Sequence, residues 1–262
     1  MKKAKFLLVA AVILAASSCT SYKNVPYLQN SDELDASTVT KLYDARIQPK
    51  DMLTITVSSE NYEAAIPYNL TVATVQSAAT RYVTSQPTLQ TYLVDNDGNI
   101  DYPSLGQLHV GGLTKNETEK MIKEKLTPFL NGAFIVNVRM VNYKISVIGE
   151  VTRPNTYTVS NEKVNILEAL ALAGDLTIYG RRDNVKLIRE NTDGSKNIVT
   201  LNLNDANIIY SPYYYMQQND ILYVEPNKAK AQNSDIGQMT TLAFSATSIF
   251  ISLVNLLYNI VR

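Results

Sequence analysis

Apolar and polar residues alternate over several short stretches in the middle of the chain, a pattern that predicts β-strands. The best example is KISVIGEVTRPNTYTV at residues 144–159, where the alternation continues on both sides of the tripeptide RPN. Pro154 presets φ to about −65° and Asn155 tolerates a left-handed backbone, so the chain can reverse tightly there. This stretch is therefore predicted to form a β-hairpin.

Further strands are predicted on both sides of this hairpin. Before it, residues 52–57 alternate, an Asp-Gly turn at 97–98 joins a second pair of strands, and the apolar segment 133–141 follows. After it come VKLIRE, a second Asp-Gly turn at 193–194, NIVTLNL and NDILYVEP. Residues 58–87 show no such pattern and indicate no role.

Two helices are predicted from their first residues. Each begins with a capping box, in which two side chains three positions apart satisfy free backbone amides. The capping pairs are Thr114 with Glu117 and Asn165 with Glu168. The first helix should end before Pro128 and the second at Gly174. The residues expected on the buried faces are Met121, Ile122 and Leu126 in the first helix, and Ile166, Leu167, Leu170 and Ala173 in the second.

The start of the chain differs from its middle. Three lysines precede an apolar run that is too short to span a bilayer, which is typical of a signal peptide. The run ends in Ala-Ser-Ser before Cys19, a sequence that resembles a lipobox. Residues 1–18 are therefore expected to be a lipoprotein signal peptide, Cys19 the lipidation site, and the polar residues 19–42 a tether.

The end of the chain predicts a membrane-spanning helix. After a linker at 227–239, residues 240–262 carry no charge except at Arg262, and a continuous helix there would extend roughly 33 Å. Polar residues recur at steps of three and four and would form one stripe, predicted to line a pore. The stripe contains Thr241, Ser245, Ser248, Ser252, Asn255 and Asn259. The alternative is a solitary span, or a helix pair that uses these small polar residues for packing.

Composition excludes several classes of function. A chain of 262 residues with 45% hydrophobic and 18% charged residues can hold one or two folded domains. Without the lysines of the signal peptide, acidic residues outnumber basic ones by three, which disfavours nucleic-acid binding. One cysteine and one histidine cannot form a Cys/His zinc site, and His109 is interpreted as structural. No metal or cofactor is expected. No local pair of carboxylates marks a glycan-cleaving enzyme.

The order of these motifs resembles that of a known family. The hairpin, helix and strands of residues 143–226 resemble the SLBB module, a β-grasp domain. Within residues 43–142, IQPKDMLTITV and VDNDGNIDYPSLGQLHVGGLTKNE resemble the polysaccharide export domain of Wza-like outer-membrane lipoproteins. Four positions where the family commonly has glycine differ here: Lys50, Asn155, Asp175 and Asn219. Asn and Asp tolerate a left-handed backbone, so the turns at 155, 175 and 219 can keep their shape, whereas the turn at Lys50 can differ locally.

The resemblance implies an α+β fold: an export domain of strands plus one helix, then an SLBB-type β-grasp domain, then the C-terminal amphipathic transmembrane helix. It also implies a non-catalytic, lipid-anchored, ring-forming outer-membrane channel for capsular polysaccharide or exopolysaccharide, with its domains in the periplasm. The implied partner is an inner-membrane polysaccharide co-polymerase, often with a tyrosine kinase. The alternative is a monomeric periplasmic carbohydrate-binding lipoprotein that uses the β-grasp module. The rings of Tyr213–Tyr215 could stack on sugars, or pack between strands or protomers.

Overall fold

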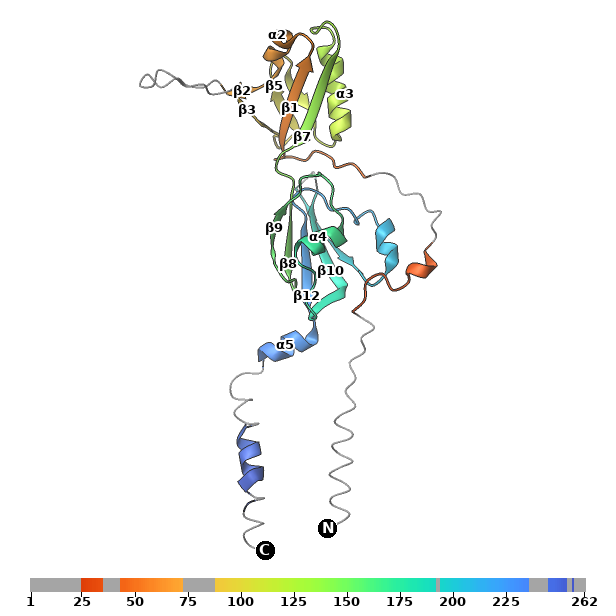
Figure 1. Ribbon diagram of the computed structural model, residues 1–262, viewed down its shortest axis with the longest axis vertical. Coiled ribbons are helices and arrows are strands. Elements are labelled where there is room, and N and C mark those ends of the chain that lie inside the picture. Colours follow the sequence, from red (N-terminus) through yellow and green to blue (C-terminus); the bar gives the residue numbers. More distant parts are fainter. Residues whose placement is uncertain are drawn as a thin grey trace, which may run out of the picture.

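Two sheet-based domains lie end to end in the computed structural model (Figure 1). The structure describes residues 25–34, 43–72, 88–191, 194–235, 245–253 and 256. The first domain comprises the described part of 43–142 and the second that of 143–226. Helix α5, Lys228–Asp235, follows the second domain at the end that lies away from the first (Figure 1).

The first domain is built on a three-stranded antiparallel sheet with the strand order β4-β1-β7. Its strands are β1 Met52–Ser59, β4 Tyr92–Leu93 and β7 Phe134–Met140, and helix α3, Lys115–Leu126, packs against β7. Around them lie the hairpin of β5 Asn99–Tyr102 and β6 Gly106–His109, the pair β2 Thr71–Val72 and β3 Thr88–Leu89, helix α2 Tyr62–Ala65 and the 3-10 turn η3 Ile66–Tyr68. The predicted alternation of β1 is confirmed, because Leu53, Ile55 and Val57 all point into the core.

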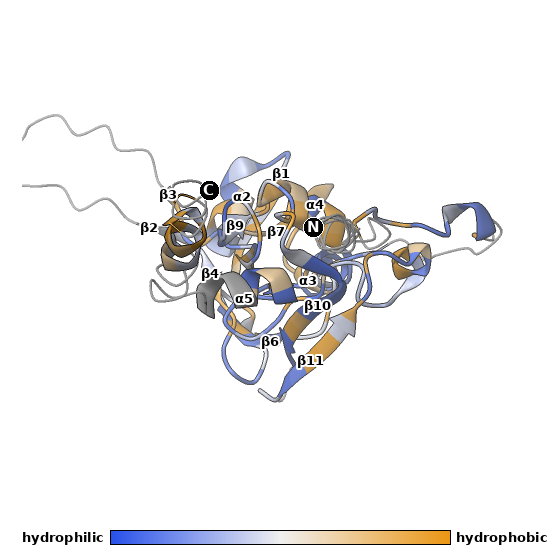
Figure 2. Ribbon diagram, turned by 90° about the horizontal axis from the view of Figure 1, so that it is seen from below, coloured by the Kyte–Doolittle hydropathy of each residue, from blue (hydrophilic) through white to orange (hydrophobic). Residues whose placement is uncertain are grey.

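The second domain is built on a five-stranded sheet with the strand order β11-β10-β12-β8-β9, in which only β12 and β8 run parallel. Its strands are β8 Lys144–Gly149, β9 Asn155–Thr158, β10 Gly180–Glu190, β11 Lys196–Leu201 and β12 Ile221–Pro226. Apolar and polar residues alternate along β10 and β11 (Figure 2). Helix α4, Ile166–Leu172, lies across one face of the sheet, and the 3-10 turn η4, Ala206–Tyr210, precedes β12.

The hairpin predicted at 144–159 is confirmed, but its turn is not tight. Strands β8 and β9 pair from Lys144 with Thr158 to Val147 with Asn155, so Asn155 opens the second strand and does not have a left-handed backbone. The intervening loop instead follows the segment after α4: the Arg153 N–H donates to the Ala173 carbonyl at 2.8 Å. Hydrogen bonds to this segment, which is distant in the sequence, hold the loop open. The residues of the turn itself do not predict such bonds.

The other turn predictions have mixed outcomes. Asp175 and Asn219 do adopt the left-handed backbone that the family glycines would supply, with φ of 70° and 64°. Gly98 makes a turn with φ of 79°, but the strands beside it do not pair with each other: β4 joins β1 and β5 joins β6. Both capping boxes are present, and Leu170 is buried as expected. Leu167 is only half-buried, because Ala169 takes the inward position.

Residues 25–34, within the segment expected to be a tether, lie against the second domain. The Leu28 N–H donates to the Leu203 carbonyl at 3.1 Å, and the Gln29 N–H donates to the Asn204 carbonyl at 2.7 Å. The Tyr27 hydroxyl donates to the Asp175 carboxylate. The short 3-10 turn η2, Ser31–Glu33, ends this segment, which is called the N-terminal strap below.

The predicted C-terminal transmembrane helix is wrong. Among the described residues, no helix combines the length and apolar character needed to cross a bilayer. Helix α5 is polar and occupies part of the expected linker.

Candidate functional site at the junction between the two domains

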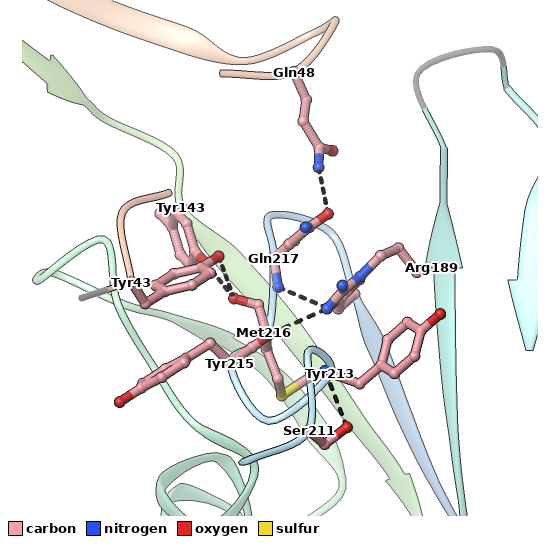
Figure 3. A network of polar contacts seen from close by, with 10 residues as sticks. Tyr43, Gln48, Tyr143, Arg189, Ser211, Tyr213, Tyr215, Met216 and Gln217 are labelled. Atoms are coloured by element: carbon pink, nitrogen blue, oxygen red, sulfur yellow. Dashed lines mark hydrogen bonds and ion pairs between the residues drawn. The ribbon is translucent and has the colours of Figure 1, made fainter. Parts of the chain in front are cut away.

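Polar side chains from both domains meet where the first domain joins the second (Figure 3). At the centre, the backbone carbonyl of Met216 accepts hydrogen bonds from two tyrosine hydroxyls, Tyr43 at 3.2 Å and Tyr143 at 2.6 Å. Tyr43 begins the first domain, and Tyr143 lies in the connection between β7 and β8. Burial raises the pKa of both hydroxyls above the ordinary value, so they stay protonated as donors.

The tyrosine run 213–215 lies within this junction. The Tyr215 ring stacks on the Tyr43 ring with centroids 4.7 Å apart, and the Lys163 ammonium lies 4.7 Å from the Tyr215 centroid. The Arg189 guanidinium lies 5.5 Å from the Tyr213 centroid. Offset stacking and cation–π contacts each contribute about 1 kcal/mol beyond the burial of the rings. Of the two interpretations offered for this run, packing is the one that these contacts support.

A buried ion pair lies next to the tyrosines. The Arg189 Nη2 donates to Asp220 Oδ2 at 2.7 Å and its Nε donates to Asp220 Oδ1 at 3.1 Å, while Nη2 also donates to the Tyr215 carbonyl. The Gln217 N–H donates to the same carboxylate at 2.6 Å. Burial raises the pKa of Asp220, and the guanidinium opposes that shift. Both charges are therefore compensated inside the protein.

Amide side chains extend the network across the domain boundary. Gln48 of the first domain donates through Nε2 to the side-chain oxygen of Gln217 in the second domain at 3.1 Å. Gln218 donates through Nε2 to the Asn142 carbonyl at 2.8 Å, and the Asn142 side chain accepts from the Met52 N–H at 3.1 Å. The start of β1 is thus tied to the turn before β12.

A glutamate from the second domain caps the exposed edge of β7. Glu162, buried and with φ of 55°, accepts the Met140 N–H at 2.9 Å and lies 3.6 Å from the Lys115 ammonium. Glu119 of α3 caps the Val138 N–H in the same way, at 2.9 Å, from within the first domain. Such caps block a free strand edge, and the Glu162 cap also links the two domains.

Both domains match families of known proteins. The family described as "Polysaccharide biosynthesis/export protein" matches residues 39–141, and the family described as "SLBB domain" matches residues 143–224. Together the two matches cover more than half of the chain. The chain therefore contains a region that matches the polysaccharide biosynthesis/export protein family, followed by a region that matches the SLBB domain. These regions coincide with the first and second domains, as the resemblance implied.

Two curated relatives are named "EPS I polysaccharide export outer membrane protein EpsA". The protein from Ralstonia nicotianae is 29% identical over 107 residues, which is 39% of this chain and 28% of the relative. The protein from Ralstonia solanacearum is 30% identical over 95 residues, which is 35% of this chain and 25% of the relative. The alignment therefore spans only about a quarter of the length of each relative.

None of the described residues that the sequence predicted as sites belongs to the junction. Cys19, Thr241, Asn255 and Asn259 lie outside the described residues. Ser245, Ser248 and Ser252 are exposed on the helical residues 245–253, and the Ser252 hydroxyl donates to the Ser248 carbonyl at 3.0 Å. The assignment of this stripe to a pore wall required a membrane-spanning helix, and no described helix meets that requirement.

Sequence reasoning missed the charged pair of the junction, although the sequence holds a signal for it. Along β10, the buried positions Val185 and Leu187 are followed two residues later by Arg189. Before β12, Asp220 stands two residues ahead of the buried Leu222. Since strand residues two apart share a face, both charges fall on the buried side of the sheet. Because a buried charge needs a partner of opposite sign, a buried arginine and a buried aspartate on the same face are expected to form an ion pair.

The polar groups of the junction already have hydrogen-bond partners within the protein. They are therefore suited to fixing the relative orientation of the two domains. In the described part of the chain, no group of three or more His, Cys, Asp or Glu residues could hold a metal ion. His109 is exposed, and its Nδ1 lies 2.9 Å from the Asn99 side-chain oxygen. The junction therefore acts as a positioning element of the export and SLBB domains.

Proposed function

We propose that this chain is a lipid-anchored, ring-forming and non-catalytic subunit of an outer-membrane channel that exports capsular polysaccharide or exopolysaccharide. The observation that carries the proposal is the export domain followed directly by an SLBB domain, the two matches meeting at residues 141 and 143. The printed names of the two relatives, polysaccharide export outer membrane proteins, support the same role and location.

The junction supports assembly into a ring. In a closed ring every subunit repeats the same contacts, so each must hold its two domains at the same angle. The Gln48–Gln217 hydrogen bond and the Glu162 cap on Met140 are directional contacts between the domains that keep that angle. A chain whose domains moved independently would present a different surface to each neighbour.

The N-terminal strap supports a defined orientation relative to the membrane. Because Tyr27 and Leu28 bind the SLBB domain, a lipid on Cys19 would lie only eight positions before the first bound residue, at most roughly 29 Å away. The SLBB domain then stays close to the outer membrane, and the export domain extends into the periplasm. There it can reach the expected inner-membrane polysaccharide co-polymerase with its tyrosine kinase.

The test combines export and assembly. Deleting the gene should abolish surface polysaccharide, wild type should restore it, and Cys19→Ser should lose the lipid and leave the outer-membrane fraction. Light scattering of the detergent-extracted protein should give a mass of several subunits. A monomer that is dispensable for surface polysaccharide would instead support the carbohydrate-binding lipoprotein and overturn the proposal.

A further inference from the structure

A cleft of about 460 Å³ opens between the two domains, beside the Gln48–Gln217 contact of the junction. The export domain contributes Lys50 from the turn before β1 and Asn96 from the turn after β4. The SLBB domain contributes Glu190 at the end of β10 and Asn219 from the turn before β12. The cleft exists only because the junction holds these four turns together.

The side chains that line the cleft are available to a ligand. In the described part of the chain, Lys50, Asn96, Glu190 and Asn219 make no side-chain hydrogen bond or ion pair. Other polar groups nearby already have hydrogen-bond partners. Gln48, for example, donates to Gln217. The four free groups all come from exposed turns, so a ligand can reach them without displacing a contact of the fold.

The chemistry of the lining fits a neutral, hydroxyl-rich ligand. Each asparagine amide offers two donors and an acceptor, which complement sugar hydroxyls that both donate and accept. Among the described lining residues, the opposite charges of Lys50 and Glu190 balance, so these residues supply no excess charge to attract a polyanion. The volume lies within the range of ligand sites, about 300 to 1,000 Å³.

Two backbone features preform the cleft. Lys50 and Asn219 have left-handed backbones, with φ of 71° and 64°, and hydrogen bonds fix each of them. The Lys50 N–H donates to the Val94 carbonyl and the Asn219 N–H donates to the Lys144 carbonyl, both at 2.9 Å. A preformed site binds without an ordering penalty. None of the described lining residues is aromatic, so the stacking energy of strong sugar sites is missing and binding should be weak.

We propose that this cleft is a weak subsite for a neutral stretch of the exported polysaccharide. The proposal rests on the proposed export function, because that function supplies the hydroxyl-rich polymer. Weak binding is what transport needs: a polymer that passes the SLBB and export domains must be held in place and then released.

The test measures binding of size-fractionated oligosaccharides, released by mild acid from the polymer that the host strain secretes, to the full chain in detergent. The variant is Asn96→Ala with Asn219→Gly, which removes both amides and keeps the left-handed turn at 219. Saturation-transfer NMR titrations should show weak binding to wild type and at least tenfold weaker binding to the double variant. Its melting temperature should stay unchanged, since neither side chain contacts the fold.

The matched control lies on another side of the same junction. Asn161 lines a smaller cavity of about 110 Å³ together with Lys163, and Asn161→Ala removes one amide there. This control should bind the oligosaccharides as wild type does. Equal binding by wild type and the double variant, or no binding by wild type, would overturn the cleft proposal. The proposed function is judged separately, because it fails only if gene deletion leaves surface polysaccharide unchanged.

Discussion

At the residue scale, two buried carboxylates of this chain have opposite surroundings. Asp220 faces the Arg189 guanidinium, whereas Asp51 accepts only the Gln48 N–H at 2.8 Å and leaves its other oxygen without a partner among the described residues. Burial raises the pKa of Asp51 from 3.8 to about 6. The folded protein therefore favours the protonated acid at this position, and the ionised form destabilises it.

Asp51→Asn should stabilise the protein at pH 8. Since the folded pKa lies above the unfolded one, the stability that Asp51 contributes is fully present below pH 3.8 and is lost as pH rises through about 6. The loss amounts to roughly 3 kcal/mol, and asparagine avoids it because it keeps the acceptor for Gln48 without a charge. Urea unfolding at pH 5 and pH 8 measures the effect. The control Asp44→Asn, a substitution at an exposed position, should not change the free energy of unfolding at either pH.

Arg189→Leu should lower the free energy of unfolding by about 3 to 5 kcal/mol at pH 7.5, because it leaves the Asp220 carboxylate buried and unpaired. The penalty should shrink as pH falls, because that carboxylate takes up a proton. Arg181→Ala, which breaks the more exposed pairs with Asp183 and Glu225, should cost less than about 1 kcal/mol. Equal losses for the two variants would show that the Arg189 pair is solvated.

The residue scale also shows what a sequence can reveal about a site. Extending the alternation of β10 and β12 by one step places Arg189 and Asp220 on the buried face, so this pair was predictable. The Glu162 cap was not, since its partner is a backbone amide of the other domain. A side chain that binds a backbone group leaves no complementary residue type in the sequence.

At the scale of elements, local signals predicted the elements better than their connections. Both helices begin at the predicted capping boxes because such a box involves only neighbouring residues. The loop after β8 departs from the predicted tight turn because it hydrogen-bonds to Ala173 and Asp175 after α4. Gly149, at the end of β8, is also constrained by a segment distant in the sequence. A Cβ atom at this position would lie 2.1 Å from the Val224 carbonyl oxygen of the neighbouring β12.

Gly149→Ala should therefore lower the melting temperature sharply or prevent folding, because β8 and β12 would have to separate. Gly132→Ala is the matched control, since Gly132 has nearly the same φ, 91° against 92°, and nothing within 4 Å of its Cβ position. The control should lose only the backbone strain of a left-handed alanine, about 1 kcal/mol. Thermal unfolding followed by circular dichroism compares the two. Similar losses of melting temperature for the two variants would mean that backbone strain, and not the contact with β12, explains why glycine is required at position 149.

At the scale of the whole molecule, motif order was sufficient to predict the export and SLBB domains, and the comparisons confirm both. Several contacts that join them were not predictable, because they connect positions far apart in the sequence, such as Gln48 and Gln217, which are 169 residues apart. The C-terminal span failed for another reason. The sequence shows only that an apolar segment is long enough, whereas no helix among the described residues is both long and apolar enough to cross a bilayer.

The last prediction concerns how strongly the two domains unfold together. Glu162→Ala should split the unfolding of the full chain into two calorimetric transitions, because it removes a buried contact between the SLBB domain and β7 and leaves the Met140 N–H unpaired. Wild type should unfold in one transition. The matched control is Glu119→Ala, which uncaps Val138 from within the export domain.

Both variants remove a carboxylate cap from the same strand edge, so each should lower stability by about 1 to 3 kcal/mol. Only Glu162→Ala breaks a link between domains, and only that variant should separate the transitions. A single transition for Glu162→Ala, or an equal split for Glu119→Ala, would show that the cap does not couple the domains. The fixed domain angle, which both the ring and the cleft require, would then depend on the other contacts between the domains, such as the Gln48–Gln217 hydrogen bond and the stack of Tyr43 on Tyr215.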